Sequence, residues 1–292
     1  MSKCAACQID IRLGDIEGNL EKMFAFTREA AANGAKIIVF PEASLSGYCF
    51  DTLEEALPYA QDPNGEITQR VTTLAKDLDV HIILGILERG NSPSPDRPIP
   101  IFNTALLIGP DGLEYAYRKI HLPYIGVDRW TTPGDRQPMV VEARGLRLGI
   151  NICYDLAFPE LARTLALLGA DLIVLPTNWP PHAKIMPEKA APTRAMENGV
   201  YYLASGRVGL ERDCQFLGHS LICDPSGKFL AEGDGISETI LYADIDPERA
   251  RNKHVVRIAG QSELHRFGDR RPEFYGELIK QHNEPTPHVL PR

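Results

Sequence analysis

Short apolar runs alternate with amphipathic segments along most of the chain. Apolar runs bounded by turn-forming residues are typical of buried strands, whereas apolar residues three or four positions apart are typical of helices. This pattern predicts strands at residues 3–9, 36–41, 80–87, 102–108, 113–118, 139–142, 146–152, 171–176, 200–205, 219–223 and 239–244. It predicts helices at residues 15–33, 66–79, 159–168 and 187–198, with Pro192 as a local irregularity. The alternation of strands and helices indicates an α/β fold.

Two pairs of segments resemble each other at corresponding places in the two halves of the chain. NGAKIIVFPEAS (33–44) resembles LGADLIVLPTNW (168–179), and LLIGPDG (106–112) resembles LICDPSG (221–227). Each half therefore has helix–strand units and a hairpin with a Pro/Gly turn. We predict one domain over residues 1–280, built from two similar halves, with two sheets packed between helices. Residues 281–292 have no core pattern and are expected to form a tail.

Composition narrows the class of protein. The chain has 292 residues, 43% of them hydrophobic, and a net charge of −8, which argues against a nucleic-acid or anionic-membrane partner. It shows neither a signal-peptide pattern nor an apolar run long enough to span a membrane. Six cysteines in a chain of this length do not indicate a disulfide scaffold. We therefore expect a cytoplasmic protein with reduced thiols.

The first strand contains a CxxC pair, Cys4 and Cys7. Residues three apart in a strand point to opposite faces, and no second CxxC is present to complete a four-cysteine zinc site. The pair is therefore expected to be structural, and no metal site is predicted.

The most informative stretch is 146–170, with Cys153 at its centre. The predicted strand ends just before Cys153, and Pro159 suits the first turn of a helix. A thiol at such a turn lies beside backbone N–H groups that have no helical partner. Those groups can stabilise a thiolate and a developing oxyanion. The alternative is a buried structural cysteine.

Two further reactive residues follow predicted strands. Glu42 comes directly after VFP, and Lys119 follows the strand that ends at residue 118. Sheet-based enzymes commonly collect their sites at strand ends. A thiol nucleophile needs a base, which Glu42 can provide, and an oxyanion donor, which Lys119 and the Tyr154 backbone N–H can provide. Glu42 and Lys119 can equally be solvated charges, and the residues alone do not place them beside Cys153.

Three segments around these residues resemble the motifs of the nitrilase, or carbon–nitrogen hydrolase, superfamily, in the family's order. They are VFPEASLSGY with Glu42, YRKIHLP with Lys119 and NICYDLAFPELAR with Cys153. The resemblance extends over nearly the whole chain through AACQIDIRLGDIEGNL, TTPGD, RAMENGVYYLASGRVG and GHSLICDPSG.

The resemblance implies a four-layer αββα sandwich that pairs as αββα–αββα in a homodimer or higher oligomer. It also implies a Glu42–Lys119–Cys153 triad, with the Tyr154 backbone N–H in the oxyanion hole, and neither a metal nor an organic cofactor. The implied reaction is hydrolysis of a C–N bond through a thioester on Cys153, with a small molecule as substrate.

The residues after the nucleophile, Cys-Tyr-Asp followed by Phe-Pro-Glu, are more similar to the amidase and carbamoylase branches than to true nitrilases. We therefore expect an amidase acting on a small amide. The alternatives are an N-carbamoyl amino acid or amine amidohydrolase, a nitrilase, and a catalytically silent scaffold.

One departure from the family pattern concerns a second glutamate that many relatives have after the lysine. No glutamate occurs between Lys119 and Asp135, and the nearest acid in the right stretch is Asp128. Asp128 could reach Lys119 or a substrate if its loop folds inward. The favoured expectation is instead a surface ion pair with Arg129 or Arg136, the common state of loop acids.

Other candidate pocket residues lie in loops. Tyr48, Asn178 and Trp179 follow strands, where a pocket wall is expected, although ordinary loop packing is the alternative. If Asp128 does not act in the site, His121 or Tyr124 is expected to line that side of the pocket.

Two acid–arginine pairs near the nucleophile are expected to be structural ion pairs. They are Asp155 with Arg163 and Arg194 with Glu197.

Overall fold

The computed structural model describes residues 1–91, 99–282 and 284–288. Most of the proline-rich segment 91–100, which the sequence predicts to be an exposed loop, lies outside these residues.

Twelve strands form two sheets that join at one point. The first sheet has the order β5 (Gly112–Arg118), β4 (Ile101–Gly109), β3 (His81–Arg89), β2 (Ile37–Val39), β1 (Ser2–Asp10) and β14 (Thr239–Ile245). The second has the order β6 (Val140–Ala143), β7 (Leu146–Ile150), β8 (Leu172–Thr177), β9 (Tyr201–Val208), β12 (Leu221–Cys223) and β13 (Phe229–Glu232). The sheets meet where the ends of β1 and β9 pair in parallel.

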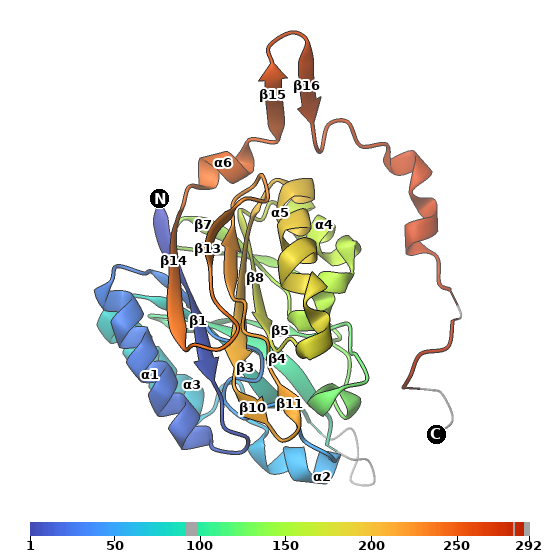
Figure 1. Ribbon diagram of the computed structural model, residues 1–292. Coiled ribbons are helices and arrows are strands. Elements are labelled where there is room, and N and C mark those ends of the chain that lie inside the picture. The colour runs from blue at the N-terminus through green and yellow to red at the C-terminus, as the bar shows by residue number, and fades with distance from the viewer. Residues whose placement is uncertain (92–98, 283, 289–292) are drawn as a thin grey trace.

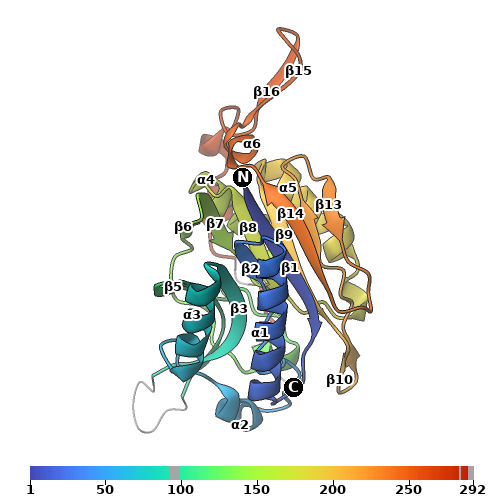
Figure 2. The same ribbon diagram turned by 90° about the vertical axis from the view of Figure 1, so that its left-hand side faces the viewer.

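Helices cover the outer face of each sheet. Figure 1 shows α1 (Ile16–Ala32) and α3 (Glu66–Leu78) on one side of the strands, and α4 (Pro159–Leu167) and α5 (Ala191–Asn198) on the other. Figure 2 shows the first sheet and its two helices from their own side. The α/β class and the αββα layers predicted from the sequence are confirmed, whereas the pairing of two such units remains a prediction.

Strand β1 shows how the alternation of side chains builds these layers. Cys4 and Ala6 belong to the core between the two sheets, which extends to α4 and α5. Ala5 and Cys7 belong to a second core, against α1 and α3. Cys4 and Cys7 therefore face opposite sides of the sheet, as predicted, and burial raises the pKa of both thiols.

Several predicted boundaries follow local signals. The Asp15 side chain caps α1 by accepting a hydrogen bond from the Gly18 N–H at 3.0 Å. The two Pro/Gly turns do join hairpins, β4–β5 in the first half and β12–β13 in the second. The helix predicted from residue 187 becomes a regular α-helix only at Ala191, after a π-helical turn at Met186–Ala190. Pro192 is the second residue of this α-helix and follows the π-helical turn directly, which fits the predicted irregularity at this position.

The sequence pattern missed several short elements of two to five residues, because so few residues carry little periodicity. These are α2 (Leu53–Ala56), β10 (Leu210–Glu211), β11 (Cys214–Gln215), α6 (Pro247–Arg251), β15 (His254–Ile258) and β16 (Ser262–His265).

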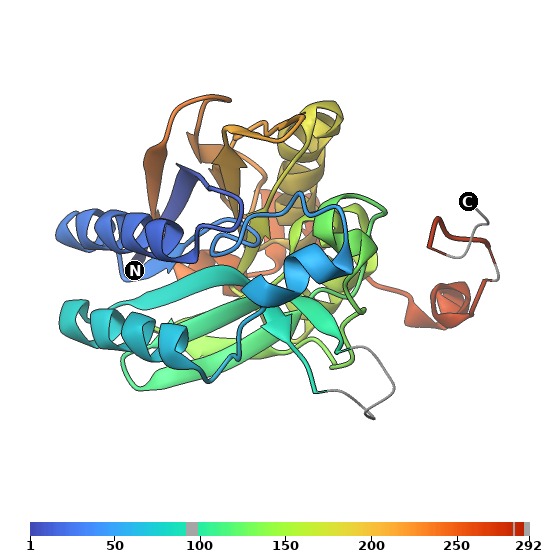
Figure 3. The same ribbon diagram turned by 90° about the horizontal axis from the view of Figure 1, so that it is seen from below.

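Residues 254–282 form an arm. Figure 1 shows the β15–β16 hairpin standing away from the sheets and helices, and Figures 1 and 3 show the segment that follows the hairpin out to one side. The arm exposes large apolar side chains, among them Phe274, Leu278 and Ile279, the last with 90% of its surface exposed. Beyond the arm, the His288 ring contacts the Leu122 carbonyl at 3.1 Å. The division into one domain at 1–280 and a tail remains a prediction.

Candidate active site

Three strand ends bring the predicted triad together. Glu42 follows β2, Lys119 follows β5 and Cys153 follows β7. The Lys119 ammonium lies 2.7 Å from Glu42 Oε1, and neither side chain is exposed. Both charges act electrostatically on the Cys153 thiol, which is 9% exposed. The sequence motifs therefore converge on one buried cluster.

The backbone is left-handed beside two of these residues. Cys153 has φ of 44° and Ala43, next to Glu42, has φ of 47°. Residues with a side chain rarely adopt this conformation, and it is concentrated at functional sites. Strand β3 closely approaches the Glu42 turn, since a Cβ on Gly85 would lie 2.2 Å from the Ala43 nitrogen. Gly85 thus allows the sheet to support this turn directly.

A buried carboxylate organises the turn that carries Cys153. Asp155 accepts hydrogen bonds from the Ile152 N–H at 2.9 Å and from the Tyr117 hydroxyl at 2.8 Å. The His121 ring lies 2.7 Å from the same carboxylate. The expected pair of Asp155 with Arg163 is therefore wrong, because the Ile152 N–H, the Tyr117 hydroxyl and the His121 ring already surround this acid. The predicted pair of Arg194 with Glu197 is confirmed at 3.0 Å.

Asp128 also belongs to this cluster. It is fully buried, and its carboxylate lies 2.5 Å from the Lys119 ammonium. The Tyr48 hydroxyl donates to it at 2.8 Å. The expected surface pair with Arg129 or Arg136 is wrong, because the short helical turn Gly126–Arg129 folds inward.

Asn103 is a site residue that the sequence analysis missed. Its amide nitrogen donates to Glu42 at 2.7 Å and to Asp128 at 2.9 Å. It thereby holds two carboxylates that would otherwise repel each other. A polar residue inside the apolar run of β4 was the available signal.

The electrostatics favour a neutral thiol and a charged lysine. Burial, together with the Glu42 carboxylate, raises the pKa of Cys153 to about 12, although Lys119 acts in the opposite direction. Burial also raises the pKa of Glu42. Burial acts to lower the pKa of Lys119, but Asp128 and Glu42 raise it well above its ordinary value. The thiol is therefore mainly protonated, and its attack on an amide requires a base that takes the proton.

One oxygen of Glu42 is left free for that role. Oε1 accepts hydrogen bonds from Lys119 and Asn103, whereas the buried Oε2 has no partner among the described residues. A buried acceptor without a partner is costly unless something else occupies it. The free oxygen is thus available to a thiol or a water.

A cavity of about 480 Å³ opens at Cys153. Four of the candidate pocket residues line it, namely Tyr48, Tyr124, Asn178 and Trp179. Asp128 does not line it but lies behind the Tyr48 hydroxyl. His121 lines a different cavity and stacks on Phe158.

The fold and this cluster together define a hydrolase of the cysteine-nucleophile α/β type. The sequence matches the carbon-nitrogen hydrolase family over residues 3–254, and the chain belongs to that family. A nitrilase from Pyrococcus abyssi is 37% identical, the match covering 94% of this chain and 99% of the relative. The human omega-amidase NIT2 is 33% identical, the match covering 94% of this chain and 97% of the relative.

A solved structure shares the fold. The crystal structure of an amidase from Nesterenkonia sp. superposes with a TM-score of 0.75 at 24% identity, covering 95% of this chain and 96% of that one. A variant of the same amidase carries the acetamide moiety of fluoroacetamide covalently on its active-site cysteine.

The described residues contain no helix long and apolar enough to cross a membrane. They also contain no group of three or more His, Cys, Asp or Glu arranged to hold a metal ion.

Proposed function

We propose that the protein is an amidase that hydrolyses a small amide through a thioester on Cys153. The observation that carries the proposal is the buried Glu42 carboxylate, which shares a cluster with the Cys153 thiol and the Lys119 ammonium and whose Oε2 has no partner among the described residues. The two relatives named a nitrilase and an omega-amidase support C–N bond hydrolysis.

In the acylation step, Glu42 takes the Cys153 proton and the sulfur attacks the amide carbon. Lys119 and the Tyr154 backbone N–H stabilise the negative oxygen of the tetrahedral intermediate. Glu42 then passes its proton to the nitrogen, the C–N bond breaks, and ammonia leaves. The acyl group remains on sulfur as a thioester.

In the deacylation step, a water molecule occupies the place that ammonia left. Glu42 removes a proton from this water, and the resulting hydroxide attacks the thioester carbon. The C–S bond breaks, the carboxylic acid leaves, and the proton returns to Cys153. One carboxylate thus acts as a base in both halves of the reaction.

The experiment that tests this function measures ammonia release from simple amides, ω-amides, N-carbamoyl compounds and nitriles. A slow amide should also leave an acyl adduct on the peptide that contains Cys153. Cys49 and Cys214 provide an internal control, because they line a neighbouring cavity. An adduct on either of them instead of Cys153 would refute the assignment.

A silent scaffold with this fold is the alternative of another class. A scaffold has no use for a reactive thiol, so a thiol probe would not select Cys153 over the half-buried Cys49 and Cys214. Selective labelling of Cys153 would therefore exclude it.

We predict that Asp128→Asn lowers kcat by about tenfold or more, a barrier increase of roughly 1.4 kcal/mol. The substitution removes a charge that fixes the Lys119 ammonium but keeps the size of the side chain. The measurements are steady-state kinetics and thermal unfolding. Arg129→Gln is a matched control, because Arg129 belongs to the same turn but contacts the Phe50 carbonyl outside the cluster. Unchanged kcat/KM in Asp128→Asn would show that Asp128 has no part in catalysis.

We also predict a homodimer or higher oligomer that buries α4 and the C-terminal arm. Leu167 and Leu168 at the end of α4 are about half exposed, and the arm exposes Phe274 and Ile279. Sedimentation velocity should show at least a dimer at assay concentrations, and Phe274→Asp with Ile279→Asp should weaken it. A fully active monomer would contradict the prediction. A reducing compartment such as the cytoplasm suits the thiol chemistry.

A further inference from the structure

The wall of the catalytic cavity is mainly apolar away from Cys153. The segment after β8 supplies much of this wall, and Ile125 faces it from the loop after β5. The apolar residues of this wall include Ile125, Trp179, Pro180, Ala183, Ile185 and Met186. Such a surface favours a hydrocarbon acyl group, because burial of apolar area drives its binding.

Little positive charge faces the part of the cavity where the acyl group of a substrate would lie. Among the described residues that line the cavity there is no lysine or arginine, and the exposed His182 is the one imidazole. Lys119 lies behind the cavity, already between two carboxylates. Lys184 lies in the same segment and forms an ion pair with Glu188 at 3.4 Å.

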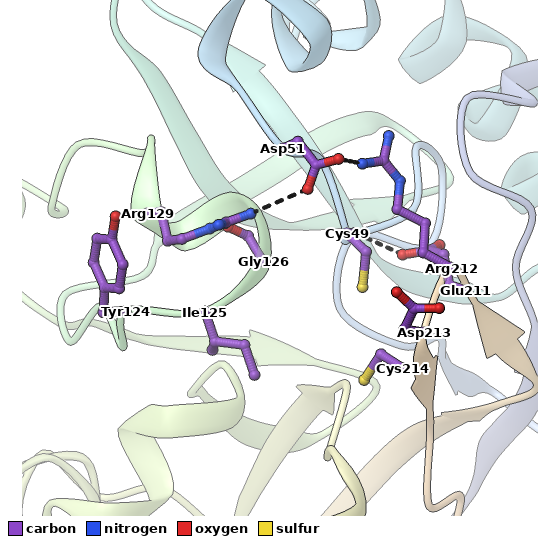
Figure 4. A pocket seen from close by; sticks show the side chains of 10 residues that line it. All are labelled: Cys49, Asp51, Tyr124, Ile125, Gly126, Arg129, Glu211, Arg212, Asp213 and Cys214. Carbon is purple, nitrogen blue, oxygen red and sulfur yellow. Dashed lines mark hydrogen bonds and ion pairs between the residues drawn. The ribbon is translucent and has the colours of Figure 1, made fainter.

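Two guanidinium groups line a neighbouring cavity, shown in Figure 4. Tyr124 and Ile125 line both cavities. Arg129 points toward Asp51 and donates to the Phe50 carbonyl at 2.9 Å. Arg212 forms ion pairs with Asp51 and Glu55.

Acidic groups dominate that second cavity. Two arginines face three carboxylates among its lining residues, and the carboxylates are Asp51, Glu211 and Asp213. The neighbouring cavity therefore cannot serve as an anion subsite for a substrate that extends from Cys153.

We infer that this site accepts primary amides with an uncharged, apolar acyl group and rejects amides that carry a carboxylate. The inference rests on the amidase function proposed above and names its substrate class. It excludes ω-amides of dicarboxylic acids and N-carbamoyl amino acids, although one relative is named an omega-amidase. The reason is that a carboxylate placed against the apolar wall loses its hydration and meets no lysine or arginine among the described residues that line the cavity.

The direct test compares two amides of equal size, 4-methylpentanamide and succinamate. They differ in replacement of an isopropyl group by a carboxylate. We expect kcat/KM for 4-methylpentanamide to exceed that for succinamate by about 100-fold or more, because an unpaired charge is costly to bury. Equal values, or a preference for succinamate, would overturn the inference and leave the amidase function standing. Absence of hydrolysis of both amides, and of the wider amide panel, would instead refute the proposed function.

A second test does not depend on turnover. Iodoacetamide and iodoacetate are thiol reagents of similar size, one neutral and one anionic. We expect Cys153 to favour iodoacetamide by about tenfold or more beyond the ratio that free glutathione shows, as measured by peptide mass spectrometry. A ratio equal to that of glutathione would mean that the cavity does not discriminate charge, which contradicts the inference.

A charge-introducing variant tests the cause. Ile185 lies on the cavity wall and is 62% exposed, so a longer polar side chain fits there without core strain. Ile185→Lys should shift the succinamate to 4-methylpentanamide ratio toward succinamate by about tenfold or more. Ile185→Gln is the uncharged control and should leave the ratio near that of the wild type. An equal shift in both variants would show that charge is not the determinant.

Discussion

Replacement of Cys153 by alanine should abolish amide hydrolysis while leaving the fold intact. Loss of a nucleophile in enzymes of this type lowers kcat by about 10⁴-fold or more. The substitution removes one sulfur atom that borders a cavity, so little packing is lost. Strain at the left-handed backbone remains, because alanine adopts φ of 44° no more readily than cysteine does. Ammonia release and the thermal unfolding midpoint measure the two effects.

A second cysteine variant separates loss of the nucleophile from loss of any thiol. Cys214 lies in β11, outside the catalytic cavity. The Cys214→Ala variant should therefore retain amidase activity, and its Cys153 should still be labelled by a thiol reagent. The Cys153 variant should be inactive with an unchanged unfolding midpoint. Residual hydrolysis above about 1% of the wild-type rate would exclude a thioester on Cys153 as the main route.

The helices, the strands and the triad candidates were predicted from local signals in the sequence. For this reason most of the predicted helices and strands agree with the structure. Periodicity marked β7 and α4, and a sharp change of pattern marked the turn at Cys153. Glu42 and Lys119 were visible as polar residues at strand ends. Their convergence was not visible, because it depends on how two sheets stack, and only the family resemblance suggested it.

The missed features depend on long-range contacts. Asn103 joins Glu42 to Asp128 from the middle of a strand, and the partners are 61 and 25 residues away. Asp128 was expected to be a surface acid because Arg129 and Arg136 follow it in the sequence, whereas in the structure it pairs with the buried Lys119. A charge that is already buried gains more from a partner than an exposed arginine does. The sequence therefore predicted the candidate triad residues better than it predicted Asn103 and Asp128, which position them.

The same cluster predicts the behaviour of Glu42→Gln. An amide cannot accept the thiol proton, so acylation and deacylation should both fail, with kcat/KM lower by about 10³-fold or more. The variant keeps the Lys119–Asp128 pair and the hydrogen-bonding shape of the side chain. In the wild type, kcat/KM should fall as pH falls through the raised pKa of Glu42, since the base must be ionised. This acid limb should therefore lie at higher pH than for an ordinary glutamate.

Alkylation of Cys153 in Glu42→Gln distinguishes loss of the catalytic base from disruption of the active site. Removal of the Glu42 charge removes a cause that raises the thiol pKa, while the Lys119 cation that favours the thiolate remains. Iodoacetamide should therefore still label Cys153 in Glu42→Gln, although the variant turns over no amide. The two results together would show that Glu42 moves protons in the reaction with an amide and is not needed to build a reactive thiol. Glu211→Gln is a control for loss of a buried carboxylate, because Glu211 pairs with Arg207 and accepts a hydrogen bond from the Tyr48 N–H rather than from Lys119. Wild-type turnover in Glu42→Gln would rule out its role as the base, and loss of labelling together with a lowered unfolding midpoint would show that Glu42 acts mainly in folding.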